Sequence, residues 1–145
     1  MFFLNKCPWK VIEILRKRVP DVLFQMLLRS TNARVYTNYI NSVVQKFCKQ
    51  APKSGVDVFR VFNSINYIKN LKLDIYAAGS AGGFVECNLS CTGDVSGPIK
   101  DKYNIEYYIN LERDLANMGV HSLSVKYNMG LLIPPTSTML VLALG

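Results

Sequence analysis

The chain has 145 residues, of which half are hydrophobic and 19% are charged, and its formal net charge is +7. This length and composition predict one globular domain with a real core and exclude a disordered chain. The basic residues are scattered, with one tight run at residues 16–18 and no interleaved stacking aromatics. We therefore expect a solvated basic face and no nucleic-acid partner.

The cysteines and the chain ends indicate neither a zinc framework nor a membrane span. The four cysteines show no CxxC spacing, and the single His121 cannot complete a zinc site, so we expect mostly buried free thiols in a reducing compartment. The apolar run at residues 1–4 is too short for a signal peptide, and the apolar tail 139–144 is far below the ~20 residues of a membrane helix. We expect no membrane partner.

Hydrophobic periodicity predicts helices that alternate with strands. Pro8 suits the first position of a helix, which closes at Val19-Pro20. The near-continuous apolar run 22–28 is typical of a strand buried on both faces. Further strands are predicted over 56–62, 84–90 and 120–126, and further helices over 39–50, 67–78, 105–118 and from 135. Pro52 should shorten the last turn of the helix that begins near residue 39, and Ser54-Gly55 should end it.

The glycine-rich stretch GSAGG, residues 79–83, follows a predicted helix and precedes a predicted strand. A phosphate-binding loop requires the reverse order, so we interpret the stretch as a helix stop.

Four strand–loop–helix units at spacings near 30 residues predict an α/β fold with a parallel sheet and right-handed crossovers. A closed barrel of eight such units needs ~250 residues. The chain therefore holds about half a barrel, and its four strands leave two unpaired edges.

Ligand chemistry in such folds collects at the carboxyl ends of the strands. Arg29 suits a small carboxylate there, because its guanidinium can bind both oxygens, and Tyr36 could add a hydroxyl donor; a surface ion pair is the alternative. A buried amine at Lys126 tends to be neutral, which suits a Schiff base or a metal-ligating carbamate; reaching solvent is the alternative. The polar residues at the four predicted ends are Arg29, Asn63, Thr92 with Asp94, and Lys126, whereas His121 lies at the other end of its strand.

Five segments stand out as motifs, together with the stretch through Lys126: CPWKVIEILRKRVP, FQMLLRSTNARVYTNY, DVFRVFNSINY, AAGSAGG and CTGDVSGP. They resemble the carboxyltransferase domain of pyruvate carboxylases in its animal-type form, and the resemblance covers essentially the whole chain. It implies a partial TIM (βα)8 barrel of about four βα units, strands three to six, so that residues 1–145 form a partial pyruvate carboxyltransferase domain. The family reaction transfers a carboxyl group from carboxybiotin to pyruvate, gives oxaloacetate, and serves gluconeogenesis and anaplerosis.

The resemblance also implies roles for individual residues. Arg29 takes the place of the arginine that binds the pyruvate carboxylate, with Tyr36 assisting. Lys126 takes the place of the lysine that is carboxylated and ligates a divalent metal, manganese or zinc. Asp57 matches a family acid, although its position at the start of a strand suggests a structural role.

The chain departs from the family pattern. Ser30 and Val35 replace loop glycines, Asn63 replaces an aspartate, and residues 126–130 are KYNMG where the family has Lys-Asp-Met-Ala-Gly. The other metal ligands, the threonine that shuttles the proton and the domain that carries biotin correspond to positions outside these 145 residues.

We therefore expect this chain to be inactive alone. One alternative is a non-enzymatic half barrel that self-associates or pairs with a full-length relative, and another is a lyase that uses Lys126 as a Schiff base. The resemblance implies the mitochondrial matrix; otherwise, without a transit peptide in this chain, we expect the cytoplasm.

Overall fold

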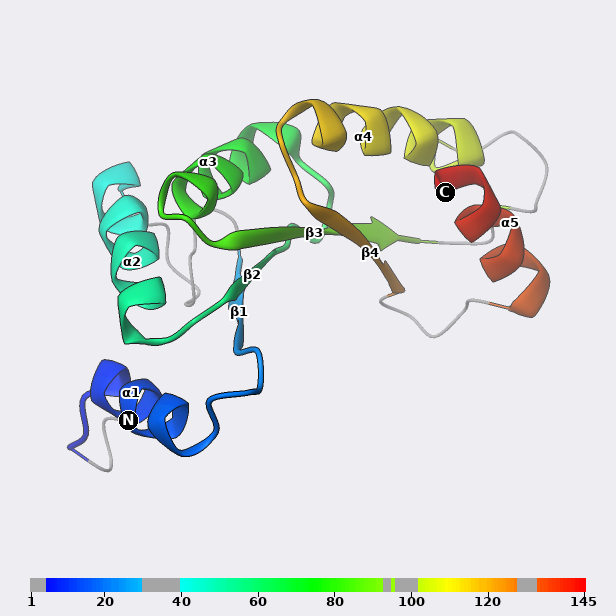
Figure 1. Ribbon diagram of the computed structural model, residues 1–145. Coiled ribbons are helices and arrows are strands. Elements are labelled where there is room, and N and C mark those ends of the chain that lie inside the picture. Colours follow the sequence, from blue (N-terminus) through cyan, green and yellow to red (C-terminus); the bar gives the residue numbers. More distant parts are fainter. Residues whose placement is uncertain (1–4, 30–39, 93–94, 96–101, 128–132) are drawn as a thin grey trace.

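The computed structural model describes residues 5–29, 40–92, 95, 102–127 and 133–145. In this part of the chain, helices and strands alternate from end to end (Figure 1). The elements are α1 (Pro8–Arg18), β1 (Gln25–Leu28), α2 (Asn41–Ser54), β2 (Val58–Val61), α3 (Ile68–Ser80), β3 (Phe84–Cys91), α4 (Ile105–Asn117), β4 (Ser122–Tyr127) and α5 (Pro134–Leu144).

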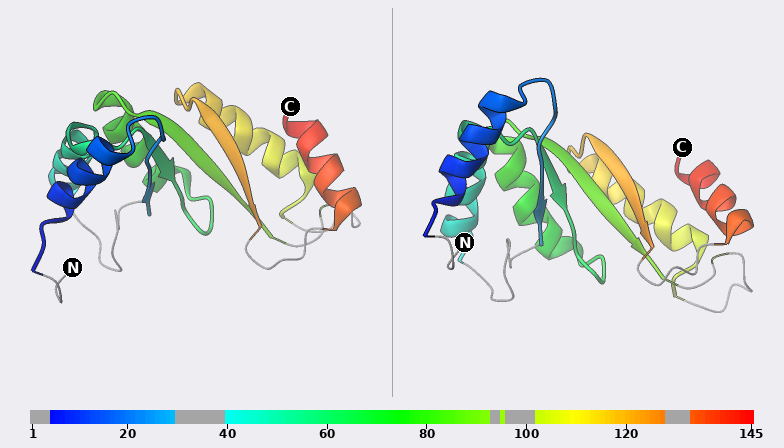
Figure 2. Two further views of the ribbon diagram at one scale, coloured as in Figure 1. Left: turned by 60° about the horizontal axis from the view of Figure 1, so that its bottom comes forward. Right: turned by 90° about the horizontal axis from the view of Figure 1, so that it is seen from below.

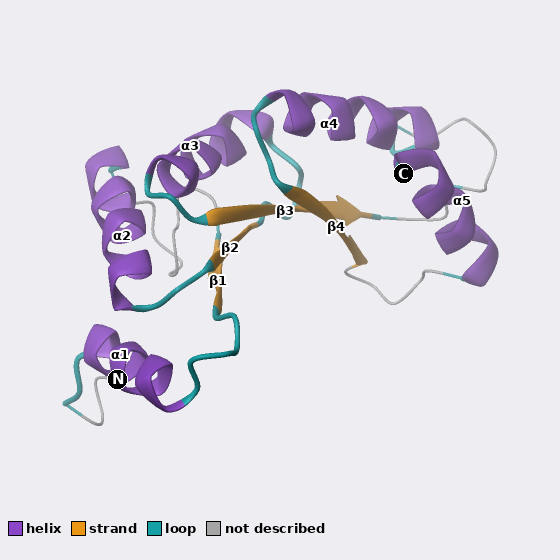
Figure 3. Ribbon diagram, in the orientation of Figure 1, coloured by secondary structure: helices purple, strands orange, loops and turns teal. Residues whose placement is uncertain are grey.

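The strands form one parallel sheet in the order β1-β2-β3-β4, so strands that follow one another in sequence are also neighbours in space. The sheet is curved, and α2, α3 and α4 lie along its outer side (Figures 1 and 2). Figure 3 shows the same alternation, with every crossover between neighbouring strands made through a helix. The predicted parallel α/β architecture is confirmed.

The helix ends follow from local chemistry. α1 begins at Pro8, whose missing N–H is not needed in the first turn. α2 ends on Gly55, which adopts the left-handed conformation at φ 109° and donates its N–H to the carbonyls of Ala51 and Pro52. The predicted end at Ser54-Gly55 is confirmed, and Pro52 lies inside the last turn.

The GSAGG stretch is a helix stop, as predicted. α3 ends at Ser80, and the chain turns at Gly82, where φ is +78°. Gly83 then donates its N–H to the Ala78 carbonyl at 3.2 Å, and β3 begins at the next residue.

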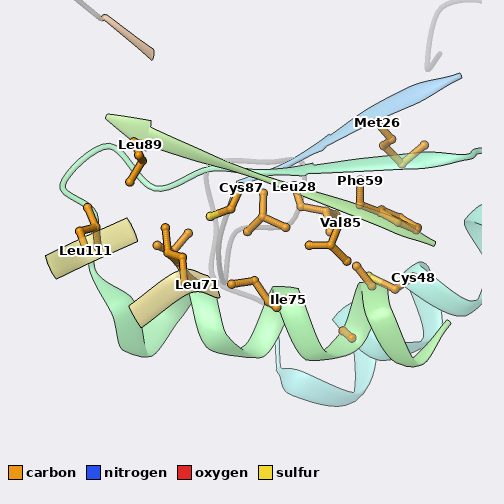
Figure 4. Packing of buried hydrophobic residues seen from close by; sticks show 14 of the residues in the cluster. Met26, Leu28, Cys48, Phe59, Leu71, Ile75, Val85, Cys87, Leu89 and Leu111 are labelled. Atoms are coloured by element: carbon orange, nitrogen blue, oxygen red, sulfur yellow. The ribbon is translucent and has the colours of Figure 1, made fainter. Parts of the chain in front are cut away.

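The core lies between the outer face of the sheet and the helices. Figure 4 shows side chains of β1, β2 and β3 packed against Leu71 and Ile75 of α3 and Cys48 of α2. Cys48, Cys87 and Cys91 are buried free thiols, and Cys7 is exposed. Within the described stretches, no helix is both long enough and apolar enough to cross a bilayer.

The prediction that residues 22–28 form a strand buried on both faces is wrong. β1 covers only Gln25–Leu28, and its burial alternates: Met26 and Leu28 are buried, whereas Leu27 is 39% exposed. Leu23, before the strand, is 73% exposed. The apolar run lies on a sheet edge with helices along one face only, so the alternate side chains face solvent.

Arg16 attaches α1 to the amino ends of β1 and β2. Its guanidinium donates to the Gly55 carbonyl at 2.7 Å and to the Val22 carbonyl at 2.8 Å, and it forms an ion pair with Asp57. Asp57 also accepts a hydrogen bond from the Phe24 N–H at 2.7 Å. Asp57, the residue that matches a family acid, therefore has a structural contact set, as its place before β2 suggested.

Candidate functional site

Arg29 and Lys126 lie on the same rim of the sheet. Arg29 directly follows β1, Phe62 directly follows β2, and Lys126 lies near the end of β4. The Lys126 Nζ atom is 3.5 Å from the centroid of the Phe62 ring, and the Arg29 Cζ atom is 6.0 Å from it. Parallel strands place their carboxyl ends at one edge, so two cationic groups 97 residues apart in sequence share one aromatic neighbour.

The surroundings of Lys126 act on its charge in opposite directions. Partial burial, followed by the positive charges of Arg29 and Arg60, lowers the pKa of the Lys126 amine. The face of Phe62 favours the ammonium form, because it presents negative charge density to the cation. Among the described residues, no carboxylate forms an ion pair with Lys126.

A polar hollow of about 550 Å³ lies on the inner side of the sheet. Arg60 lines this hollow, and its Nε atom donates to one carboxylate oxygen of Glu86 at 2.7 Å. The other Glu86 oxygen accepts from the Gln25 amide at 2.6 Å. The hollow is lined by Gln25, Leu27, Arg60, Asn88, Ser124, Val125, Lys126 and Tyr127.

Glu86 is ionised and fixed in this arrangement. Burial by itself would raise the pKa of its carboxyl group, but hydrogen bonds from Arg60, Ser124 and Gln25 and the charge of Arg60 lower it overall. Glu86 on β3 and Arg60 on β2 therefore form a charged layer beneath the rim.

The sequence argument missed Phe62, Arg60 and Glu86. Along β3, FVECNLSC, polar residues alternate with apolar ones from Val85 to Cys91. That period of two could have indicated a polar inner face.

Asn63 and Asn66 organise the loop after β2. The Asn63 Oδ1 atom accepts from the N–H groups of Ile65 at 3.1 Å and Tyr67 at 3.0 Å. The Asn66 amide makes two hydrogen bonds with the backbone of Ser90, at 2.8 and 2.9 Å. Where the family pattern has an aspartate, Asn63 thus supports its own loop, and Asn66 supports the carboxyl end of β3.

Of the remaining candidates, Thr92 lies at the same edge of the sheet, directly after β3, and His121 lies at the opposite end of β4. Tyr36 and Asp94 lie outside the described residues. Thr92 donates its N–H to the Tyr108 hydroxyl at 3.0 Å. His121 is exposed before β4, and its Nδ1 atom accepts from the Val85 N–H at 3.1 Å, so it takes no part in the rim.

The described residues do not fit a metal ion. They contain no group of three histidine, cysteine, aspartate or glutamate side chains placed to hold one. The charged neighbours that act on Lys126 are the cations Arg29 and Arg60, which oppose the approach of another cation. What the rim offers instead is two positive groups suited to a small anion.

Comparison with known proteins identifies what this chain is similar to. No family model matches it. The mitochondrial pyruvate carboxylase of Mus musculus is 51% identical over 144 residues, which are 99% of this chain and 12% of that protein. The pyruvate carboxylase of Bacillus subtilis is 45% identical over 142 residues, and again 12% of the relative is covered.

A solved structure gives the same result for the fold. The carboxyl transferase domain of Rhizobium etli pyruvate carboxylase, solved with pyruvate and biocytin, matches with a TM-score of 0.90 and 38% identity. The match covers 98% of this chain and 24% of that one. The four-stranded sheet is thus part of a TIM barrel, as expected from the sequence.

Proposed function

We propose that this chain, a homologue of one segment of the pyruvate carboxylase carboxyltransferase domain, carries the pyruvate-binding side of the site and does not catalyse carboxyl transfer alone. Residues 1–145 then form a partial pyruvate carboxyltransferase domain. The observation that carries the proposal is the convergence of Arg29 and Lys126 on Phe62. The similarity in sequence and fold to pyruvate carboxylases supports the choice of ligand.

In this proposal Arg29 binds the carboxylate of pyruvate through its guanidinium fork, and Tyr36 assists with its hydroxyl. Lys126 adds a second positive charge on the same rim and is the position at which the family carries a carboxylated, metal-ligating lysine. Biotin would reach the site on another part of a biotin-dependent enzyme. A neighbouring structure that contains oxamate and biotin supports biotin as the family's cofactor.

The proposed inactivity follows from the donor set. Enolate formation from pyruvate needs strong electrostatic support at the developing oxyanion. The described residues assemble no metal site, and one lysine among cations cannot hold a divalent ion tightly. Arg29 and Lys126 can therefore bind the substrate anion without activating its methyl group.

Two measurements on the purified chain test the proposal. Incubation with pyruvate, carboxybiotin and Mn²⁺ should give no oxaloacetate above background, followed with malate dehydrogenase and NADH; formation above background would show that the inactivity is wrong. Pyruvate should bind weakly in ligand-observed NMR, and Arg29→Gln should abolish the signal. Arg113→Gln, on the exposed part of α4, is the matched control and should leave binding unchanged. Equal binding by both variants would remove Arg29 from the site.

A second candidate, self-association or pairing with a full-length relative, is favoured by the β1 edge. An apolar hollow of about 750 Å³ lies between α1 and β1. Its lining includes Leu15 and Leu23, which are 47% and 73% exposed. Light scattering after size exclusion should show a dimer whose fraction falls with Leu23→Glu. A monomer at all concentrations, with no complex on mixing with full-length pyruvate carboxylase, would contradict this candidate.

The names of the mammalian relatives include the word mitochondrial. We propose the mitochondrial matrix as the compartment, and fractionation of the source cells tests it. Recovery in the cytosol would favour the alternative drawn from the sequence.

A further inference from the structure

Asp74 is a buried acid on the side of α3 that faces the sheet. Leu71, Asp74, Ile75 and Ala78 follow the helical period and are all buried. Figure 4 shows Leu71 and Ile75 directed toward the strands. Asp74 is fully buried, at 0% exposure, and neither of its carboxyl oxygens has a hydrogen-bond partner among the residues that the structure describes. An unpartnered acid at a core position of a helix calls for a physical account.

The groups around Asp74 are neutral. Cys48 of α2 and Cys87 of β3 lie close enough to interact with it electrostatically, and burial, followed by the charge of Asp74, raises the pKa of both thiols to about 12. Phe59 and Val61, the buried residues of the adjacent strand β2, are apolar. Burial is the cause that raises the pKa of Asp74 to about 7. Near neutral pH, Asp74 is therefore the group in this cluster that changes charge.

We propose that Asp74 makes the packing of α3 against the sheet sensitive to pH, since the neutral acid fits an apolar core and the bare carboxylate does not. Helix α3 packs against α2, β2 and β3. It also follows the loop in which Asn66 binds Ser90. Ionisation of Asp74 thus destabilises the outer helical layer behind the strands that carry the rim. The inference does not depend on any substrate.

The direction of the effect follows from proton binding. The ordinary pKa of an aspartate is 3.8, so between about pH 4 and 7 the unfolded chain has lost this proton while the folded chain retains it. Stability is therefore greatest at acid pH, falls as pH rises through this window, and levels off above about pH 7. The unfolding equilibrium constant should rise roughly tenfold per pH unit from this group, and roughly a thousandfold over the window.

Urea unfolding of the full chain at pH 5, 6, 7 and 8 tests the proposal. The unfolding equilibrium constant of the wild type should rise with pH. That of Asp74→Asn, whose side chain keeps its shape and cannot ionise, should lack this rise. Asp114→Asn, at an exposed position of α4, is the matched control and should retain the wild-type pH dependence. Equal pH dependence in the wild type and Asp74→Asn would overturn the proposal.

A direct titration covers the case in which Asp74→Asn does not fold. Carboxyl carbon NMR of the wild-type chain labelled with ¹³C-aspartate should show one aspartate that titrates near pH 7. The proposal is overturned if every aspartate titrates below about pH 5.

Discussion

Gly83 provides the sharpest test of how the sheet packs. A Cβ atom at this position would lie far inside van der Waals contact with two ring carbons of Phe59, and 3.5 Å from the Ala78 carbonyl oxygen. The Phe59 ring is fully buried in β2, so it cannot swing into solvent. Gly83→Ala therefore forces either the ring or the backbone before β3 to move. Overpacking of this kind costs about 1–3 kcal/mol.

The other glycines of GSAGG make the comparison precise. Gly82 has no atom within 4 Å of an added Cβ, and its φ is +78°, so Gly82→Ala should cost only the strain of that backbone conformation, about 1 kcal/mol. Gly79 lies in α3, and its added Cβ would be 4.0 Å from a Val85 methyl group. Gly79→Ala should be neutral or stabilise by up to about 1 kcal/mol, because alanine is the better helix former.

Urea unfolding at fixed pH, supported by thermal melting, measures the series. A chain of this length loses about 2–4 °C in Tm per kcal/mol. The expected order of stability is Gly79→Ala, wild type, Gly82→Ala, Gly83→Ala. Adding Phe59→Leu to Gly83→Ala should cost less than the sum of the two single changes, since the smaller side chain relieves the clash. If Gly83→Ala matches the wild type, or the two changes add exactly, the close approach of Gly83 to Phe59 is wrong.

Two further substitutions test the contacts that frame the half barrel. Arg16→Ala removes the hydrogen bonds to Gly55 and Val22 and the ion pair with Asp57, and should lower the free energy of unfolding in urea by about 2–3 kcal/mol. The neighbouring Lys17→Ala should cost little. Equal losses in the two variants would show that Arg16 does not fix α1. Asn66→Ala leaves the backbone N–H and C=O groups of Ser90 without this partner and should cost about 1–3 kcal/mol of stability. The control Asn110→Ala, at an exposed position, should cost about 0.5 kcal/mol or less. Hydrogen exchange that stays slow at the Ser90 N–H in Asn66→Ala would contradict the role of the Asn66 amide.

Much of the fold was predictable because its signals are local. Pro8 at a helix start, Gly55 at a helix end and the glycines before β3 each act through backbone geometry that neighbouring residues determine. The exposure of residues 22–28 was not predictable in the same way. Whether an apolar strand is covered on both faces depends on elements elsewhere in the chain, and the structure places β1 at an edge.

The site was predictable to the extent that strand ends converge. Arg29 and Lys126 share a rim because both lie at the carboxyl ends of parallel strands. Their common contact with Phe62 was not predictable. A phenylalanine after a strand is ordinarily assigned to the core, and no neighbouring residue in the sequence indicates that an amine lies over its ring. Asp74 escaped notice for a related reason: an acid within an otherwise apolar helical face is ordinarily assigned to the solvent side.

Polar side chains hold part of the inner face of the sheet together. Had the inward side chains been aliphatic, the face inside the curved sheet would expose a continuous apolar surface and favour nonspecific association. Here Gln25 on β1 and Arg60 on β2 both donate to Glu86 on β3, and each of these hydrogen bonds is made within the described sheet. These polar groups satisfy one another, whereas exposed apolar side chains remain in the hollow between α1 and β1 and on α5, where Val141 and Leu142 are 59% and 77% exposed. Association of this chain at the β1 edge should therefore involve Arg29, which lines this hollow as well as the rim.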